Sequence, residues 1–214
     1  MSKQFFWFTG SVLLVAIVFV GVFATVRKNH LPESDVYTTV PEDAAILVET
    51  SNVYDFLTET RRENPIWREL QGLDAIQELD GIMGDLVPIL EQLPACVSAI
   101  DRSVVFSGHK TGKDQISFLT YIKIKQRQEL QSIEKSISKD ISYVKELSSR
   151  KYSGEELNKL TFQDSLQQAP LFYAVVKDVL VFGRSSMLVE NAIRQSDIEQ
   201  NLRANPEFEE VYQT

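Results

Sequence analysis

The sequence predicts an α+β fold in which an amino-terminal transmembrane helix precedes an antiparallel sheet with helices packed on it. Three observations support this class: an uncharged run over residues 4–26, short runs rich in β-branched and aromatic residues, and stretches of helical periodicity between those runs. The first elements have the order β-α-β-β-α-β, which predicts a ferredoxin-like start, and an extra hairpin and helix complete the sheet. The expected divisions are an anchor with its flanks (1–28), a juxtamembrane linker (29–39), an α+β domain (40–199), and the start of a further module or an incomplete helix (200–214).

Composition and charge exclude several classes of protein. The 214 residues are 43% hydrophobic and 24% charged, with one cysteine, which does not fit a collagen-like, low-complexity or disulfide-framework protein. All acidic residues lie at or beyond Glu33, so residues 31–214 contain 19 basic and 30 acidic groups and have a formal net charge of −11. This acidity argues against a nucleic-acid partner, because such binders neutralise phosphates with basic side chains.

The uncharged segment predicts a single membrane crossing. As a helix its 23 residues span about 33 Å, enough for a hydrocarbon core of about 30 Å, and Trp7 and Arg27-Lys28 fit interfacial positions. We therefore expect residues 5–26 to contact the lipid bilayer as a signal-anchor; a cleaved signal peptide is the alternative, because Val22-Phe23-Ala24 resembles a cleavage site. The flanking charges do not set an orientation. The acidic domain favours the periplasmic or extracytoplasmic side, because anionic lipids at the cytoplasmic face would repel it.

The first half of the domain predicts one strand followed by helices. After a turn at Pro41, residues 45–49 are predicted to form a strand, and the continuous apolar stretch within it indicates burial on both faces. Ser51 or Asn52 then caps a helix, and Asn64-Pro65 begins a second one. Apolar residues continue at spacings of three and four over residues 66–90, which predicts packing on a sheet; a groove for a partner helix is the alternative.

The middle of the chain predicts a hairpin, a helix and a returning strand. Residues 102–106 and 116–122 are rich in β-branched and aromatic side chains and flank a loop over residues 108–114. Residues 130–141 have one apolar helical face, and residues 143–147 can return as a strand.

The last third predicts three further additions to the sheet. Polar residues are interspersed among the apolar residues of 157–162, which suggests an edge strand. Residues 171–176 and 179–182 form a tight hairpin about Lys177-Asp178, although neither turn residue is glycine. Ser185 or Ser186 then caps a helix whose inward side chains are Leu188, Val189, Ala192 and Ile193.

A short internal similarity relates two parts of the chain. Residues 62–70 and 203–211 both read Arg-x-Asn-Pro-x-aromatic-x-Glu-aliphatic. Two independent Asn-Pro helix starts explain this, and so does a second related module that begins near residue 200. The second explanation predicts that Phe208, Val211 and Tyr212 lack packing partners and that the chain is a fragment of a longer protein.

The sequence assigns no catalytic, cofactor-binding or metal-binding residue. The loop at residues 108–114 has the wrong glycine spacing for a phosphate-binding loop, and Asp114 occupies the position of the Mg²⁺-binding hydroxyl. His30 lies in the linker and His109 in the hairpin loop, and neither belongs to a metal-binding motif. Cys96 follows an apolar segment and is expected to be a buried hydrophobe rather than a nucleophile.

Three segments, residues 40–49, 172–182 and 185–195, together resemble a bacterial envelope domain family of unknown function. Its members have one amino-terminal membrane span and an α+β module that opens with a Pro-x-Asp-Ala turn, and larger members continue past the corresponding end point. The resemblance covers most of residues 36–214, although the usual Asn or Gly of the last hairpin is absent here. It implies a cell-envelope location and supplies no catalytic residues.

These observations favour a membrane-anchored extracytoplasmic interaction or scaffold module with an envelope protein as partner. Its sheet edges would be available for strand pairing. One alternative is an envelope enzyme of the hydrolase class, whose site is completed beyond residue 214. A second alternative is a lipid- or small-ligand-binding module in which residues 66–90 line a groove.

Overall fold

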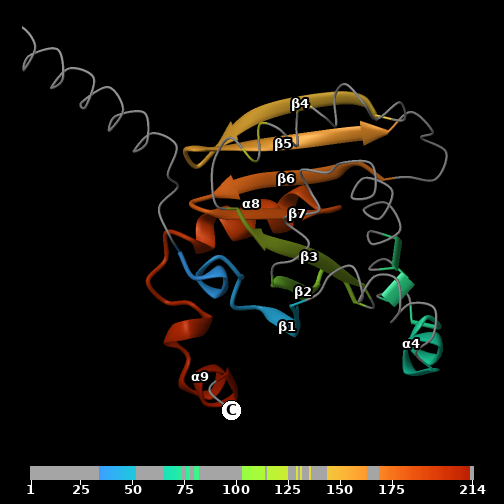
Figure 1. Ribbon diagram of the computed structural model, residues 1–214, viewed down its shortest axis with the longest axis vertical. Coiled ribbons are helices and arrows are strands. Elements are labelled where there is room, and N and C mark those ends of the chain that lie inside the picture. Colours follow the sequence, from blue (N-terminus) through green and yellow to red (C-terminus); the bar gives the residue numbers. More distant parts are fainter. Residues whose placement is uncertain are drawn as a thin grey trace, which may run out of the picture.

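The chain forms a seven-stranded antiparallel sheet (Figure 1). The computed structural model describes residues 34–51, 65–73, 76–77, 80–81, 103–113, 115–124, 129, 131, 135, 144–162 and 169–212. The strands are β1 (Ala44–Thr50), β2 (Val104–Lys110), β3 (Ile116–Lys123), β4 (Val144–Tyr152), β5 (Glu155–Phe162), β6 (Leu171–Val176) and β7 (Val179–Gly183). Their spatial order is β1-β2-β3-β7-β6-β5-β4, so β1 and β4 are the two outer strands of this sheet.

This order shows that the expected ferredoxin-like start is wrong. A ferredoxin-like start would place the first strand between the third and the fourth, whereas β1 lies at the edge of the sheet beside β2, and β4 lies at the opposite edge. The fold is therefore mostly antiparallel sheet with few helices in the described residues. Periodicity identified several strands, but strand pairing depends on contacts between distant segments that periodicity does not report.

Three hairpins build most of the sheet. The β2–β3 and β6–β7 hairpins confirm the sequence prediction, although β2 extends to Lys110 and includes much of the expected loop. The β4–β5 hairpin was missed, and its turn has positive φ at Ser153 (48°) and Gly154 (89°), as a type I′ turn requires. Because β4 pairs outside β5, the expected edge position of residues 157–162 is also wrong.

The two faces of the sheet support two apolar clusters. On one face, α8 (Ser186–Gln195) begins after its N-cap Ser185 and buries the four inward side chains expected from the sequence. On the other face, Trp67 of α4 (Pro65–Leu70) belongs to a cluster with Phe106, Phe118 and Phe182. The sheet is therefore covered on both sides near its centre, and α4 begins at Pro65 as predicted.

The first strand differs from its prediction in burial. Side chains of β1 are half-buried or exposed, and Ile46 is 39% exposed, because among the described strands β1 has a neighbour only in β2. A register shift between Ala44 and Ile46 also interrupts its alternation. The apolar run thus belongs to an edge strand and not to a strand buried on both faces.

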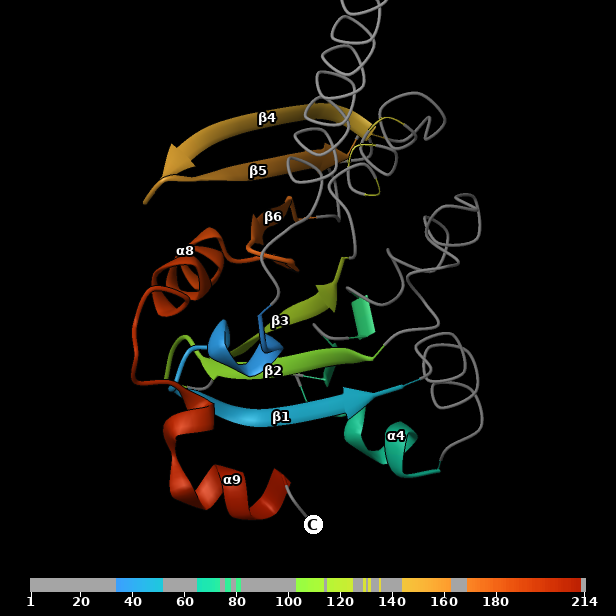
Figure 2. The same cartoon turned by 60° about the vertical axis from the view of Figure 1, so that its left-hand side comes forward.

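The described chain ends lie side by side (Figure 2). The 3-10 helix η1 (Val36–Thr38) is adjacent to η3 (Leu202–Ala204) and α9 (Pro206–Tyr212). Contrary to expectation, Phe208 and Tyr212 have a packing partner: their ring centroids lie 5.0 and 5.2 Å from that of Tyr37. Val211 is 78% exposed.

Other predicted segments lie outside the described residues, namely the apolar segment 5–26, the helix after Ser51, and most of the stretches 66–90 and 130–141. Among the helices of the described residues, none has the length and hydropathy needed to cross a membrane.

Candidate functional site

A chain of four polar side chains runs from the start of β1 into the sheet. Asp43 precedes β1, Ser107 and His109 are two residues apart on one face of β2, and Tyr121 extends from that face of β3. Asp43 Oδ1 lies 3.0 Å from His109 Nδ1, and His109 Nε2 lies 2.6 Å from Ser107 Oγ. Ser107 Oγ is in turn 3.0 Å from the Tyr121 hydroxyl. These contacts connect an exposed carboxylate with a fully buried phenol.

Burial controls the charge of this polar chain. Desolvation lowers the pKa of His109 below its ordinary value, although the hydrogen bond and charge of Asp43 oppose that shift. Desolvation also raises the pKa of Tyr121, with Ser107 opposing and Asp43 reinforcing the increase. The imidazole is therefore favoured in its neutral form, with one ring nitrogen donating and the other accepting.

The order carboxylate, imidazole, hydroxyl is also that of nucleophilic hydrolases. Here, however, Ser107 and His109 have no exposed surface. Ser107 is also paired within the sheet on both sides, with Leu47 and with Leu119, so its backbone belongs to two ladders and is not free to form an oxyanion hole. The arrangement fits a hydrogen-bonded link between β1, β2 and β3, and we assign no nucleophile to it.

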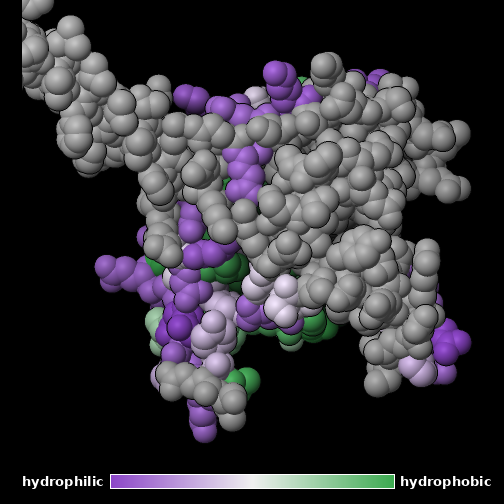
Figure 3. Space-filling view, viewed as in Figure 1, coloured by the Kyte–Doolittle hydropathy of each residue, from purple (hydrophilic) through white to green (hydrophobic). Residues whose placement is uncertain are grey.

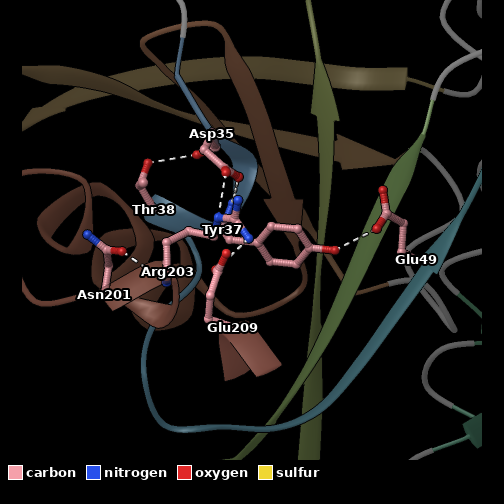
Figure 4. A network of polar contacts seen from close by, with 7 residues as sticks. All are labelled: Asp35, Tyr37, Thr38, Glu49, Asn201, Arg203 and Glu209. Carbon is pink, nitrogen blue, oxygen red and sulfur yellow. Dashed lines mark hydrogen bonds and ion pairs between the residues drawn. The ribbon is translucent and has the colours of Figure 1, made fainter. Parts of the chain in front are cut away.

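A second polar network joins the two described ends of the chain (Figure 4). The Arg203 guanidinium lies 2.9 Å from Asp35 Oδ2 and 2.8 Å from Glu209 Oε2, and it also lies over the ring of Tyr212. The Tyr37 hydroxyl donates to Glu49 Oε2 of β1 at 2.6 Å. Desolvation, followed by the hydrogen bond with Glu49, raises the pKa of Tyr37. This network, which we call the terminal clasp, holds η1, η3 and α9 beside β1.

The outer strand β4 is the most accessible part of the sheet. It is nine residues long, and its side chains from Lys145 to Lys151 are exposed apart from the half-buried Ser148. In Figure 3 the coloured atoms visible near β4 and β5 are mostly hydrophilic. Such an edge presents backbone groups that another strand can pair with.

The side chains of β4 divide between the two faces of the sheet. Leu147 pairs with Leu160 and Lys151 with Glu156, on the face of the Trp67 cluster. Arg150 pairs with Leu157 on the α8 face, where its guanidinium bonds Glu190 and lies 5.7 Å from the centroid of the Tyr152 ring. Among the described residues, no ion pair involves Lys145 or Lys151.

The structure describes only one of the residues that the sequence analysis considered for metal binding or catalysis. The prediction that His109 lies in a hairpin loop is wrong, because this residue lies in β2 and is buried. The alternation Val105, Ser107, His109 could have shown that the strand continues past Phe106, but no sequence signal connects His109 with Asp43. His30, Cys96 and Asp114 lie outside the described residues. Within the described ranges, no three His, Cys, Asp or Glu side chains are grouped so that they could hold a metal ion.

Comparison of the chain with protein-family models, with curated proteins and with solved structures gives no match. The resemblance to an envelope domain family therefore stays a prediction from residues 40–49, 172–182 and 185–195.

Proposed function

We propose that the chain is a non-enzymatic interaction module that binds a protein partner by strand addition at a sheet edge. The observation that supports this most directly is the accessibility of β4, which pairs with β5 alone among the described strands. Strand addition uses main-chain hydrogen bonds for affinity and alternating side chains for specificity. The buried Ser107 gives the hydrolase alternative little support, and the ligand-groove alternative depends on residues 66–90, which lie mostly outside the described residues.

The proposed location is the extracytoplasmic face of a membrane, with attachment through residues 5–26. It rests on the uncharged composition of this segment and on the acidity of the remaining chain. Replacing Leu14 and Ile17 together by lysine should release the full chain from membranes on alkaline washing, because each central charge opposes insertion by about 3 kcal/mol. Substituting both by alanine is the matched control. Retention of the lysine variant on the membrane would contradict attachment through this segment.

Blocking one edge of the sheet tests the interaction itself. In an antiparallel strand, neighbouring residues direct their N–H groups to opposite sides, so either Ser148 or Ser149 has its N–H directed away from β5. Ser148→Pro and Ser149→Pro are made separately in the full chain, and thermal unfolding identifies the variant that keeps the β4–β5 ladder. That variant should lose the partners that copurify with the wild type from membranes of the source cell.

A second variant controls for general surface effects. Lys113→Ala changes an exposed side chain in the loop between β2 and β3 without altering β4, and it should keep the same partners. If the folded proline variant also keeps them, strand addition at β4 is wrong. If the wild-type chain turns over substrates on a hydrolase panel, the non-enzymatic assignment is wrong.

A further inference from the structure

We propose that β4 accepts an extended acidic segment of another protein, an inference that rests on strand addition as the proposed function. The first observation is charge. Residues 145–151 contain Lys145, Arg150 and Lys151 against the single acid Glu146, in a chain whose formal net charge is −8. Arg150 is bonded to Glu190, so the charge offered to a partner comes from Lys145 and Lys151, which form no ion pair among the described residues. A strand laid beside β4 would therefore meet local positive charge on an otherwise acidic protein.

The second observation is the pattern along the strand. Leu147 is 38% exposed, and it shares a face with Lys151 four residues further on. Because cross-strand neighbours interact as pairs, the pattern favours an apolar side chain opposite Leu147 and a carboxylate opposite Lys151. A register shift between Val144 and Glu146 sets Lys145 apart from this alternation, so Lys145 adds positive charge at the beginning of β4.

Two arrangements with a second copy fit these observations less well. Antiparallel pairing of β4 with β4 of another copy, centred on Ser148, would place Lys145 opposite Lys151, which is unfavourable. The other charged pair of this arrangement, Glu146 with Arg150, would compete with the bond that Arg150 already makes to Glu190. Pairing with β1 of another copy would need Glu49 and Asp43 as the acidic side chains that face the cations of β4. These two carboxylates already bond Tyr37 and His109 within the chain. A separate acidic strand meets neither obstacle.

The test uses three palindromic peptides, so that either strand direction presents the same side chains. The acidic peptide is Thr-Glu-Thr-Val-Thr-Val-Thr-Glu-Thr, and the other two have Gln or Lys in place of both Glu residues. Fluorescence anisotropy measures the binding of each labelled peptide to the full chain in detergent. We expect the acidic peptide to bind at least about threefold more tightly than the Gln peptide and about tenfold more tightly than the Lys peptide, with the difference reduced by salt.

Charge reversal on the protein provides the matched comparison. Lys151→Glu should remove or reverse the preference for the acidic peptide, whereas Lys113→Glu, in the loop between β2 and β3, should leave it unchanged. Equal binding of all three peptides, with loss of binding in the folded proline variant, would overturn the acidic partner and leave strand addition intact. Absence of binding by all three, or self-association of the chain through β4, would overturn this inference, and partner copurification would then decide the proposed function separately.

Discussion

His109 shows how burial sets the pH response of a single side chain. Its pKa is lowered by desolvation, so between the folded and the ordinary pKa the folded protein binds fewer protons than the unfolded chain. Stability should therefore decrease as the pH falls below the ordinary value of about 6.5, by at most about 1.4 kcal/mol at pH 5.5. Asp43 limits this loss of stability, because it favours the charged form of the imidazole.

Urea unfolding of wild type and His109→Asn at pH 7.5 and 5.5 measures this contribution. The variant should be less stable at both values, because His109 is buried and hydrogen-bonded, but its stability should fall less on acidification. Ser149→Asn, at an exposed side chain of β4 that does not titrate, is the control and should retain the wild-type pH dependence. An equal loss of stability in wild type and His109→Asn would contradict a neutral buried imidazole.

Lys177 has a backbone conformation that is unfavourable for a residue with a side chain. It has φ of 56° in the β6–β7 turn, where a side chain costs about 1 kcal/mol relative to glycine, and its ammonium donates to the Ser196 carbonyl at 3.0 Å. Lys177→Gly and Lys177→Ala both remove that hydrogen bond. The difference between their free energies of unfolding therefore reports the cost of placing a side chain at this positive φ. The glycine variant should be more stable than the alanine variant by about 1 kcal/mol in chemical denaturation. At Glu156, which lies within β5, the alanine variant should be more stable than the glycine variant.

At the scale of elements, β3 and β7 approach each other closely at Gly183. A Cβ on this residue would lie 2.6 Å from the Phe118 carbonyl oxygen and 2.9 Å from Leu119 Cδ2. Because backbone must move to admit it, Gly183→Ala should reduce the free energy of unfolding by about 1–3 kcal/mol. At Gly72 the nearest atom would be 3.6 Å away, so Gly72→Ala should change stability by less than about 0.5 kcal/mol. Equal effects at both glycines would contradict the β3–β7 register.

Removing a contact of the terminal clasp should favour local opening of η3 and α9 rather than global unfolding. Phe208→Ala removes the ring contact with Tyr37, which contributes about 1 kcal/mol, and should loosen η3 and α9 from the sheet. Limited proteolysis within residues 200–212 should then be about five times faster, as a loss of this size implies. Val211→Ala, at a side chain that is 78% exposed, is the control and should be cleaved at the wild-type rate. Unchanged cleavage of Phe208→Ala would contradict the clasp.

Individual elements were predictable where the signal is local. The β2–β3 and β6–β7 hairpins and α8 depend on alternation, short connections and a serine cap, all of which lie within a few residues in the sequence. The β4–β5 hairpin was missed because Ser153-Gly154 is a weaker turn signal than Asn-Gly, and because polar residues fill both arms.

At the scale of the whole molecule, strand order could not be predicted. The position of β4 outside β5, and of β1 outside β2, depends on which distant segments bury their side chains together. The link between Asp43 and His109 joins residues 66 positions apart, and the terminal clasp joins Asp35 with Arg203. Such pairs have no local sequence signature, so the polar chain, the clasp and the accessible edge emerged only from the fold.

The same architecture explains why function is assigned to an edge. The centre of the sheet is covered on both faces by apolar clusters, and the polar chain at β2 is buried. The accessible backbone and the concentration of positive charge coincide at β4. The central claim is therefore that β4 pairs with a strand supplied by another molecule.

Amide hydrogen exchange of the full chain in detergent, measured with and without the acidic peptide at saturating concentration, tests this claim most directly. Strand addition would place new hydrogen bonds on alternate amides of β4, those directed away from β5. Exchange at these amides should slow by about tenfold or more, while amides of β1 remain unchanged. Protection that is confined to β1, or binding without slower exchange in β4, would contradict the account.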